Sequence, residues 1–170
     1  MRLLMNGVTA QSLREKGVSY HLNWGASLLH LQEMAREYEP SRELAILLWN
    51  DNIRECKILA TMLMPIEHFT KELALQWIEQ TPTQEIAEIA SKQLFCKLPY
   101  AKDLAFLLLP ALHHSPFSLI YAYCIVGSLP DLSEEEKQQA ISHARSTIDD
   151  TALPLSVRHA AHNALLRLEQ

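Results

Sequence analysis

The chain contains few of the residues that interrupt helices or cross-link a fold. Of its 170 residues only 4 are glycine and 3 are cysteine. No alternating pattern of β-branched residues continues for more than a few positions, so the sequence gives little indication of strands. Cys56, Cys96 and Cys124 are odd in number and lie in apolar segments. This argues against a disulfide framework and is typical of small buried thiols in a reducing compartment.

Several chemical signatures are also missing. There is no Gly-rich phosphate loop, no closely spaced pair of cysteines and no Ser–His–Asp pattern. His113 and His114 are adjacent and cannot face one ligand from a helix. His159 and His162 are three residues apart, but no cysteine or carboxylate nearby completes a set of four ligands. We therefore expect neither a metal nor any other cofactor.

Long apolar runs and positive charge are scarce as well. No signal peptide opens the chain, and the longest apolar candidate, 104–112, is broken by Pro110. That stretch is too short to span a membrane, so a soluble, cytoplasmic protein without a membrane partner is expected. The formal net charge of −5 lowers the expectation of tight non-specific DNA binding but is compatible with a local basic groove.

The residues that are present favour helix throughout. Apolar residues make up 48% of the chain, and leucine, alanine, glutamate and glutamine dominate. Turn and capping residues divide the sequence into roughly ten helices within a single domain, 1–170. The predicted helices are 3–16 (ending at Gly17), 26–38, 42–50, 53–63, 66–80, 84–97, 100–112, 116–128, one from Ser133 and one from about Pro154 to the C-terminus.

Capping signals set some of these boundaries. Ser41 is expected to cap 42–50, and Ser133 with Glu136 has the spacing of a capping box. Short turns make the helices antiparallel pairs, and each pair alone would leave an apolar face in water. About five pairs are therefore expected to stack on one another. On periodicity alone, a compact bundle without repeats is an alternative.

The segment 77–95 carries the most specific pattern. An apolar helix ends in Trp-Ile-Glu, and after a short loop a second helix carries Glu85 and Glu88 and closes on Leu-Phe. From about Trp24 onward, the chain resembles the DNA alkylation repair enzymes, HEAT-like-repeat glycosylases that excise alkylated purines. Further segments that resemble this family are 23–26, 47–49, 53–55, 58–60 and 157–165. The resemblance implies an all-α superhelix of about five antiparallel HEAT-like helical pairs with a concave surface.

The chain departs from the family pattern at its active site. As the resemblance implies, two tryptophans of such enzymes pack against the lesion sugar and the cationic base, an aspartate stabilises the charge that develops on the sugar, and an arginine holds a phosphate. Gln84 and Asn163 stand where the tryptophans are expected, and Glu88 stands where the aspartate is expected. Leu119 and Ile120 occupy the region of the arginine. A carboxylate is therefore retained at this position, whereas the two tryptophans and the arginine are replaced.

Glu88 is the candidate catalytic carboxylate, and Glu85 is a secondary candidate. Both also suit the first turns of a helix as ordinary solvated acids. Basic and polar residues are predicted to line the concave surface and contact phosphates, with scattered surface charge as the alternative. The candidate binding residues are Gln84, Arg54, Lys57, Lys92, Arg158, His159, His162 and Asn163, with Lys97 and Arg167 as further cations.

The larger aromatic residues are expected to pack in the core, because they lie on apolar helices. Trp49, Trp77, Tyr121 and Tyr123 belong to this group. Trp24 lies at a turn beside a glycine and is expected to be partly exposed.

The leading functional hypothesis is a diverged alkylation-repair-like protein that no longer catalyses the reaction. It would use its concave face to bind nucleic acid or protein. The alternative is an active alkylpurine DNA glycosylase in which Glu88 stabilises the oxocarbenium-like transition state. A third hypothesis is an adaptor of the same fold that binds only protein.

Overall fold

The computed structural model describes residues 24–110, 115 and 117–170. Within these ranges all regular elements are helical, with nine α-helices, two 3₁₀-helices and no strand, so the predicted all-α class is confirmed. None of these helices has the length and apolar character of a membrane span. The predicted helix 3–16 with its end at Gly17, the adjacent His113 and His114, and Pro116 lie outside the described residues.

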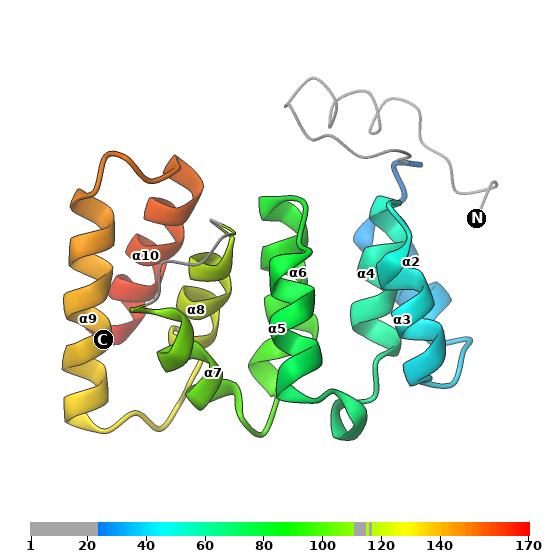
Figure 1. Ribbon diagram of the computed structural model, residues 1–170, viewed down its shortest axis with the longest axis horizontal. Helices are drawn as coiled ribbons and strands as arrows, with labels where there is room; N and C mark the ends of the chain where they lie inside the picture. Colours follow the sequence, from blue (N-terminus) through cyan, green and yellow to red (C-terminus); the bar gives the residue numbers. More distant parts are fainter. Residues whose placement is uncertain (1–23, 111–114, 116) are drawn as a thin grey trace. The chain divides into compact units, whose positions relative to one another are not determined.

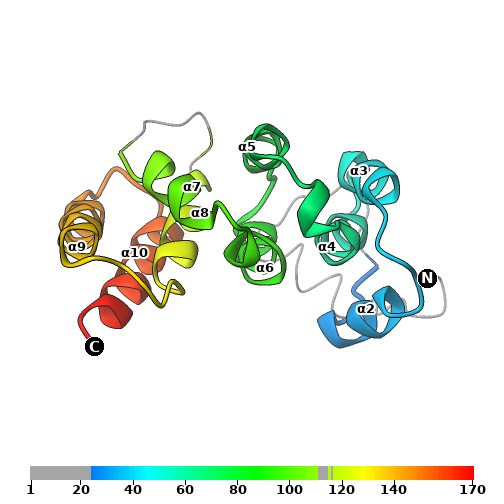
Figure 2. The same ribbon diagram turned by 90° about the horizontal axis from the view of Figure 1, so that it is seen from below.

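The chain divides into two compact units, one ending at Thr70 and the other beginning at Lys71. The first contains α2 (Leu28–Ala35), α3 (Arg42–Asn50), α4 (Arg54–Leu63) and the 3₁₀-helix η2 (Ile66–His68). Helices α3 and α4 pack side by side, and α2 contacts α4 (Figures 1 and 2). As predicted, Ser41 caps α3, because its hydroxyl accepts a hydrogen bond from Leu44 N at 3.2 Å.

A buried carboxylate anchors the first unit. Glu55 is 0% exposed, and its oxygens accept hydrogen bonds from the backbone N–H groups of Trp24 and Ala26, each at 3.2 Å. The same carboxylate accepts a bond from Arg54 Nη1 at 3.2 Å, and Arg54 also donates to Ala26 O at 3.0 Å. Between these contacts Gly25 turns the chain with φ of 71°, a conformation that glycine adopts without strain. The segment leading into α2 is thus held against α4.

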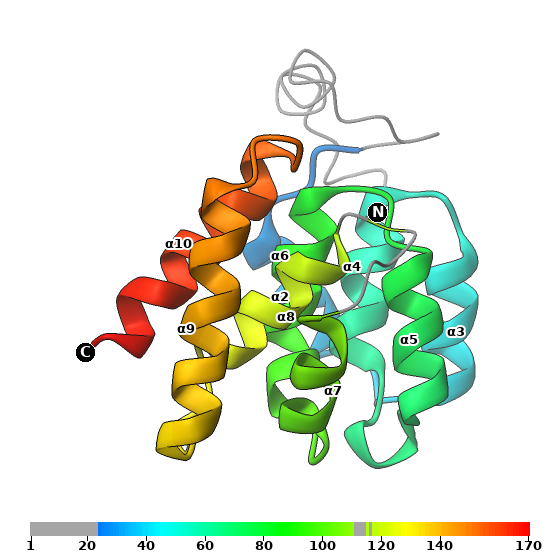
Figure 3. The same ribbon diagram turned by 60° about the vertical axis from the view of Figure 1, so that its left-hand side comes forward.

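The second unit is built around α8. Helices α5, α6, α7 and α10 all contact α8, whose residues are almost all buried. Helices α9 and α10 pack against each other as an antiparallel pair (Figures 1 and 3). The elements of this unit are α5 (Lys71–Glu79), α6 (Gln84–Gln93), η3 (Phe95–Lys97), α7 (Ala101–Leu108), α8 (Ser118–Val126), α9 (Glu134–Asp149) and α10 (Leu155–Leu168).

Two tyrosines on α8 satisfy their hydroxyl groups inside the second unit. Tyr121 shares a hydrogen bond of 2.9 Å with Thr81, and its ring centroid lies 4.6 Å from that of Phe95. Tyr123 shares one of 2.6 Å with Thr147 on α9. Burial raises the pKa of both phenols, so each stays a neutral hydrogen-bonding group. The large aromatic residues predicted to lie in the core are buried, namely Trp49, Trp77, Tyr121 and Tyr123. Trp24 is partly exposed, as expected.

Two predicted helices are interrupted. The segment 66–80 is divided because Phe69 takes an extended backbone (φ −95°, ψ 94°) and buries its ring to 2% exposure, so α5 begins only at Lys71. The segment 84–97 leaves the α-helix at Leu94 (φ −128°, ψ −59°) and continues as η3. This irregular step buries Phe95 completely. In both places core packing overrides helix propensity.

Other boundaries differ by a few residues. Helix α2 is shorter than predicted, α7 ends at Leu108, and α8 begins at Ser118.

The predicted capping box at the start of α9 is confirmed: Glu136 N donates to Ser133 Oγ at 3.2 Å, and Ser133 N donates to Glu136 Oε2 at 2.8 Å. Lys102 from α7 pairs with Glu136 at 2.8 Å. This contact and the bond from the cap backbone lower the pKa of the Glu136 carboxyl.

Replacing Glu55 with alanine is expected to lower the free energy of unfolding by roughly 3–5 kcal/mol, because the change leaves a buried guanidinium without its carboxylate partner. Urea titration followed by circular dichroism measures the change. The matched control is Glu67→Ala, an exposed acid of the same unit, which is expected to shift stability by no more than about 0.5 kcal/mol. Equal unfolding midpoints for the two variants would contradict the anchoring role of Glu55.

Candidate functional site

A recess of about 160 Å³ lies in the second unit and gathers several of the predicted site residues. Its walls come from α6, η3, α8 with the turn that follows it, and α10. We call it the α6–α8–α10 recess. Its lining residues are Glu88, Lys92, Cys96, Tyr123, Cys124, Gly127, Ser128, Ala160, Asn163, Ala164 and Arg167.

The recess exists because small residues meet where α8 ends against α10. A Cβ atom on Gly127 would lie 3.1 Å from Tyr123 O and 3.3 Å from Ala164 Cα, so only glycine allows this approach without a shift. Ala160 and Ala164 present short side chains to the same space. Larger residues at these positions of α10 would fill the recess.

Helix α6 and the turn after it contribute a row of functional groups. Glu88 and Lys92 lie one turn apart on α6, Cys96 follows in η3 after the break at Leu94, and all three line the recess. Glu88 is half-buried and Lys92 is exposed. Gln84 Nε2 donates to Glu88 Oε1 at 2.6 Å, so Gln84 touches the recess carboxylate without lining the recess itself. The carboxylate keeps unused acceptor capacity, because it has about four lone-pair sites.

Helix α10 supplies the opposite side and carries no acidic residue. Asn163 and Arg167 line the recess, and both are exposed. His159 and His162 are also exposed, whereas Arg158 is half-buried. Within α10 every charged side chain is therefore basic, and the acid that follows the helix, Glu169, forms an ion pair of 2.9 Å with Arg145 on α9.

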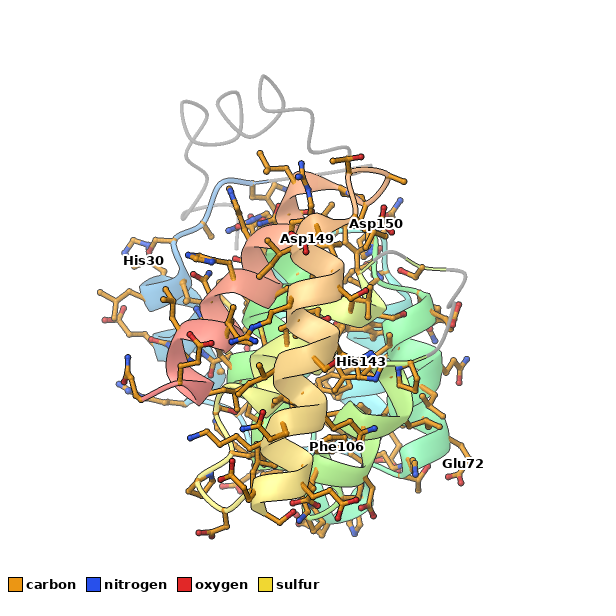
Figure 4. All side chains as sticks on the ribbon, turned by 90° about the vertical axis from the view of Figure 1, so that its left-hand side faces the viewer. His30, Glu72, Phe106, His143, Asp149 and Asp150 are labelled. Carbon is orange, nitrogen blue, oxygen red and sulfur yellow. The ribbon has the colours of Figure 1, made fainter. Side chains whose placement is uncertain are left out.

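Helix α9 has a contrasting charge pattern. Glu134 and Glu135 stand in its first turn, and Asp149 and Asp150 stand at its far end, on the side shown in Figure 4. These acidic groups oppose phosphate binding at both ends of α9. Of the paired helices α9 and α10, only α10 has the charge that suits a polyanion.

The two cysteines of the recess are neutral wall residues. Both are half-buried and free, and the Cys96 thiol donates to Cys124 O at 3.7 Å. Burial raises the pKa of both thiols, that of Cys124 to about 11. Both groups are therefore protonated at neutral pH and are poor nucleophiles. Cys96 and Cys124 were not among the site residues predicted from the sequence.

Two predicted phosphate-binding residues have interior partners in the first unit. Arg54 and Lys57 are each only 6% exposed. Arg54 bonds to Glu55 and a backbone carbonyl. Lys57 Nζ donates to Trp49 O at 2.6 Å and lies 4.8 Å from the centroid of the Trp49 ring, and burial lowers its pKa. Their burial argues against a phosphate contact, because such a contact needs an accessible cation.

Other predicted residues lie away from the recess lining. Glu85 is half-buried on α6 and does not line it, and Ile120, where an arginine is expected from the resemblance, is completely buried. In the described ranges, no group of three or more His, Cys, Asp or Glu side chains is arranged to hold a metal ion.

Comparison with known proteins establishes the fold. No protein-family model matches the chain, and no curated protein matches its sequence. A solved structure does match: it is described as belonging to a new family of proteins related to the HEAT-like repeat DNA glycosylases, with affinity for branched DNA structures. The TM-score is 0.85 at 14% identity, over 98% of this chain and 72% of the other. The chain has a HEAT-like repeat fold, and the resemblance seen in the sequence is confirmed at this level.

Proposed function

We propose that this chain is a non-catalytic DNA-binding protein that binds branched DNA at the α6–α8–α10 recess and the adjoining face of α10. The observation that carries the proposal is the recess itself, edged by Lys92 and Arg167 and bordered by a helix without acids. The solved protein of similar fold has affinity for branched DNA structures, which supports this class of ligand.

Local charge favours this face despite the acidic chain. The net charge of −5 is an average over the whole sequence, whereas phosphates respond to cations within about 10 Å at ordinary ionic strength. The exposed residues of α10 combine Arg167 with His159, His162 and Asn163. An arginine binds phosphate oxygens through paired N–H groups, and an amide adds a neutral donor. Whether this face is part of a concave surface stays a prediction.

The groups around Glu88 support binding in preference to glycosidic cleavage. Gln84 and Asn163, at the positions where the resemblance implies tryptophans, carry amides that offer no π-face to a cationic alkylated base. Gln84 also donates a hydrogen bond to Glu88, which partly satisfies the carboxylate that would have to stabilise positive charge on the sugar. A carboxylate that already accepts a hydrogen bond, with no tryptophan at either of the two positions that the resemblance implies, is a weak glycosylase site.

Junction binding is expected to weaken steeply as salt rises, because neutralised phosphates release counterions. Fluorescence anisotropy with a labelled four-way junction measures this dependence. Arg167→Ala should weaken binding at every salt concentration and lower the slope of log K against log salt by about 0.9 if it removes one phosphate contact. The control is Arg42→Ala, an exposed arginine of the first unit, whose slope should match that of the unmodified protein. Equal slopes for both variants, or junction binding that does not respond to salt, would contradict the proposal.

A second candidate function is glycosylase activity, favoured by the half-buried position of Glu88 in the recess. Incubation with methylated DNA is expected to release neither 7-methylguanine nor 3-methyladenine above background, for the reasons given above. Release that disappears in Glu88→Gln would instead establish the enzyme, with Glu88 as its carboxylate. Association with protein but not with DNA would favour the adaptor hypothesis.

A further inference from the structure

The recess contains a carboxylate where a DNA-binding surface would ordinarily have only cations and neutral groups. Glu88 lines the recess together with Lys92 and Arg167, and a phosphate placed against it would be repelled. We propose that the recess takes one unpaired nucleobase, with guanine preferred, while the DNA backbone lies along the exposed face of α10. The inference rests on the proposed DNA binding and names the part of the DNA that enters the recess.

The size of the recess suits a single base. Its volume is about 160 Å³, and a cavity of about 150 Å³ is known to hold a benzene-sized ring. Because the recess is open to solvent at the exposed Lys92 and Arg167, a two-ring base fits with one edge inward and its sugar outside. A longer piece of nucleic acid does not fit, so the sugar-phosphate chain stays on the surface.

The chemistry of the lining selects the edge of the base. Glu88 in its charged form only accepts hydrogen bonds, and one of its oxygens already accepts from Gln84 at 2.6 Å. Guanine presents two adjacent donors, N1–H and the N2 amino group, which match the two oxygens of a carboxylate. Adenine and cytosine present an amino group beside a ring acceptor, and thymine presents one N–H between two carbonyls. The Asn163 amide, which also lines the recess, can donate to a carbonyl such as guanine O6.

The neighbouring charges favour a neutral occupant. An arginine side chain from a protein partner also offers paired N–H donors to a carboxylate. That guanidinium would enter between Lys92 and Arg167, whose like charges oppose it. A neutral base meets no such repulsion, and the protonated thiols of Cys96 and Cys124 present uncharged walls to it. The same side chains thus distinguish a base from a cationic peptide.

Branched DNA supplies such a base at low cost. The N1–H edge of guanine is occupied in a base pair, so the recess can read it only when the base is unpaired. Removing a base from the stack costs a few kcal/mol and costs least where pairing is already lost, as at a mismatch or a single-stranded site. A branch point carrying an unpaired base would therefore place backbone and base against α10 and the recess together.

The test compares two labelled three-way junctions by fluorescence anisotropy, one fully paired and one with a single unpaired guanine at the branch. The measured quantity is the ratio of their Kd values. Roughly tenfold tighter binding of the unpaired guanine is expected, the discrimination typical of one good bidentate contact. An unpaired inosine at the branch, which lacks the N2 amino group, should lose most of this gain in affinity. An unpaired 7-deazaguanine, which keeps both donors, should retain it. An unpaired thymine should bind no better than the paired junction.

Glu88→Gln should bring the ratio of the two junction Kd values close to one, because an amide N–H then faces a donor of the base. The matched control is Glu79→Gln, an exposed acid at the end of α5, for which the ratio should stay near tenfold. A ratio near one for the unmodified protein, or a guanine preference that survives Glu88→Gln, would overturn the base-reading role and leave junction binding intact. Failure to bind either junction, with protein folded by circular dichroism, would overturn the proposed function as well.

Discussion

The close approach of α8 to α10 at Gly127 is the constraint on which the site depends. The missing side chain lets the end of α8 lie within contact distance of the α10 backbone at Ala164. That contact sets where Asn163 and Arg167 stand relative to Glu88 on α6, because both α6 and α10 pack on α8. A single backbone contact thereby brings residues from three helices to one recess, and short alanine side chains keep it open.

Polar groups that are buried around the recess in the second unit are kept neutral. The hydroxyls of Tyr121 and Tyr123 are satisfied inside the core and remain neutral. The recess thiols are also held neutral by burial. The charges that remain at the recess are one carboxylate and two exposed cations, and α10 itself carries no acidic residue. An anionic backbone and a neutral base rich in N–H donors are complementary to this arrangement.

Local sequence signals predicted the positions of most helices but not the tertiary contacts that interrupt them. The cap at Ser41 and the Ser133–Glu136 capping box could be predicted from the sequence, because capping depends on neighbouring residues alone. The helix interruptions at Phe69 and Leu94 could not be predicted, since they arise from burial of aromatic rings against residues far away in the sequence. The all-α class followed from composition, and the HEAT-like repeats followed from the resemblance.

The site was predicted only in part, for similar reasons. Glu88 and Asn163 were found through the resemblance, and the four-residue spacing of Glu88, Lys92 and Cys96 would have predicted a shared face. The burial of Arg54 and Lys57 was not predicted, because a sequence does not show whether a cation has an interior partner such as Glu55 or the Trp49 carbonyl. The residues of α8 and α10 that meet at the recess depend on tertiary packing, which no local spacing specifies.

The central claim is that DNA contacts the second unit at the recess and along α10. Mapping amide chemical shifts of the ¹⁵N-labelled protein during titration with an unlabelled four-way junction tests it most directly. The account predicts that the largest changes fall on residues 88–97 of α6 and η3, on 123–128 around the end of α8, and on 158–167 of α10. Changes confined to α9 or to the first unit, with those three segments unaffected, would contradict it.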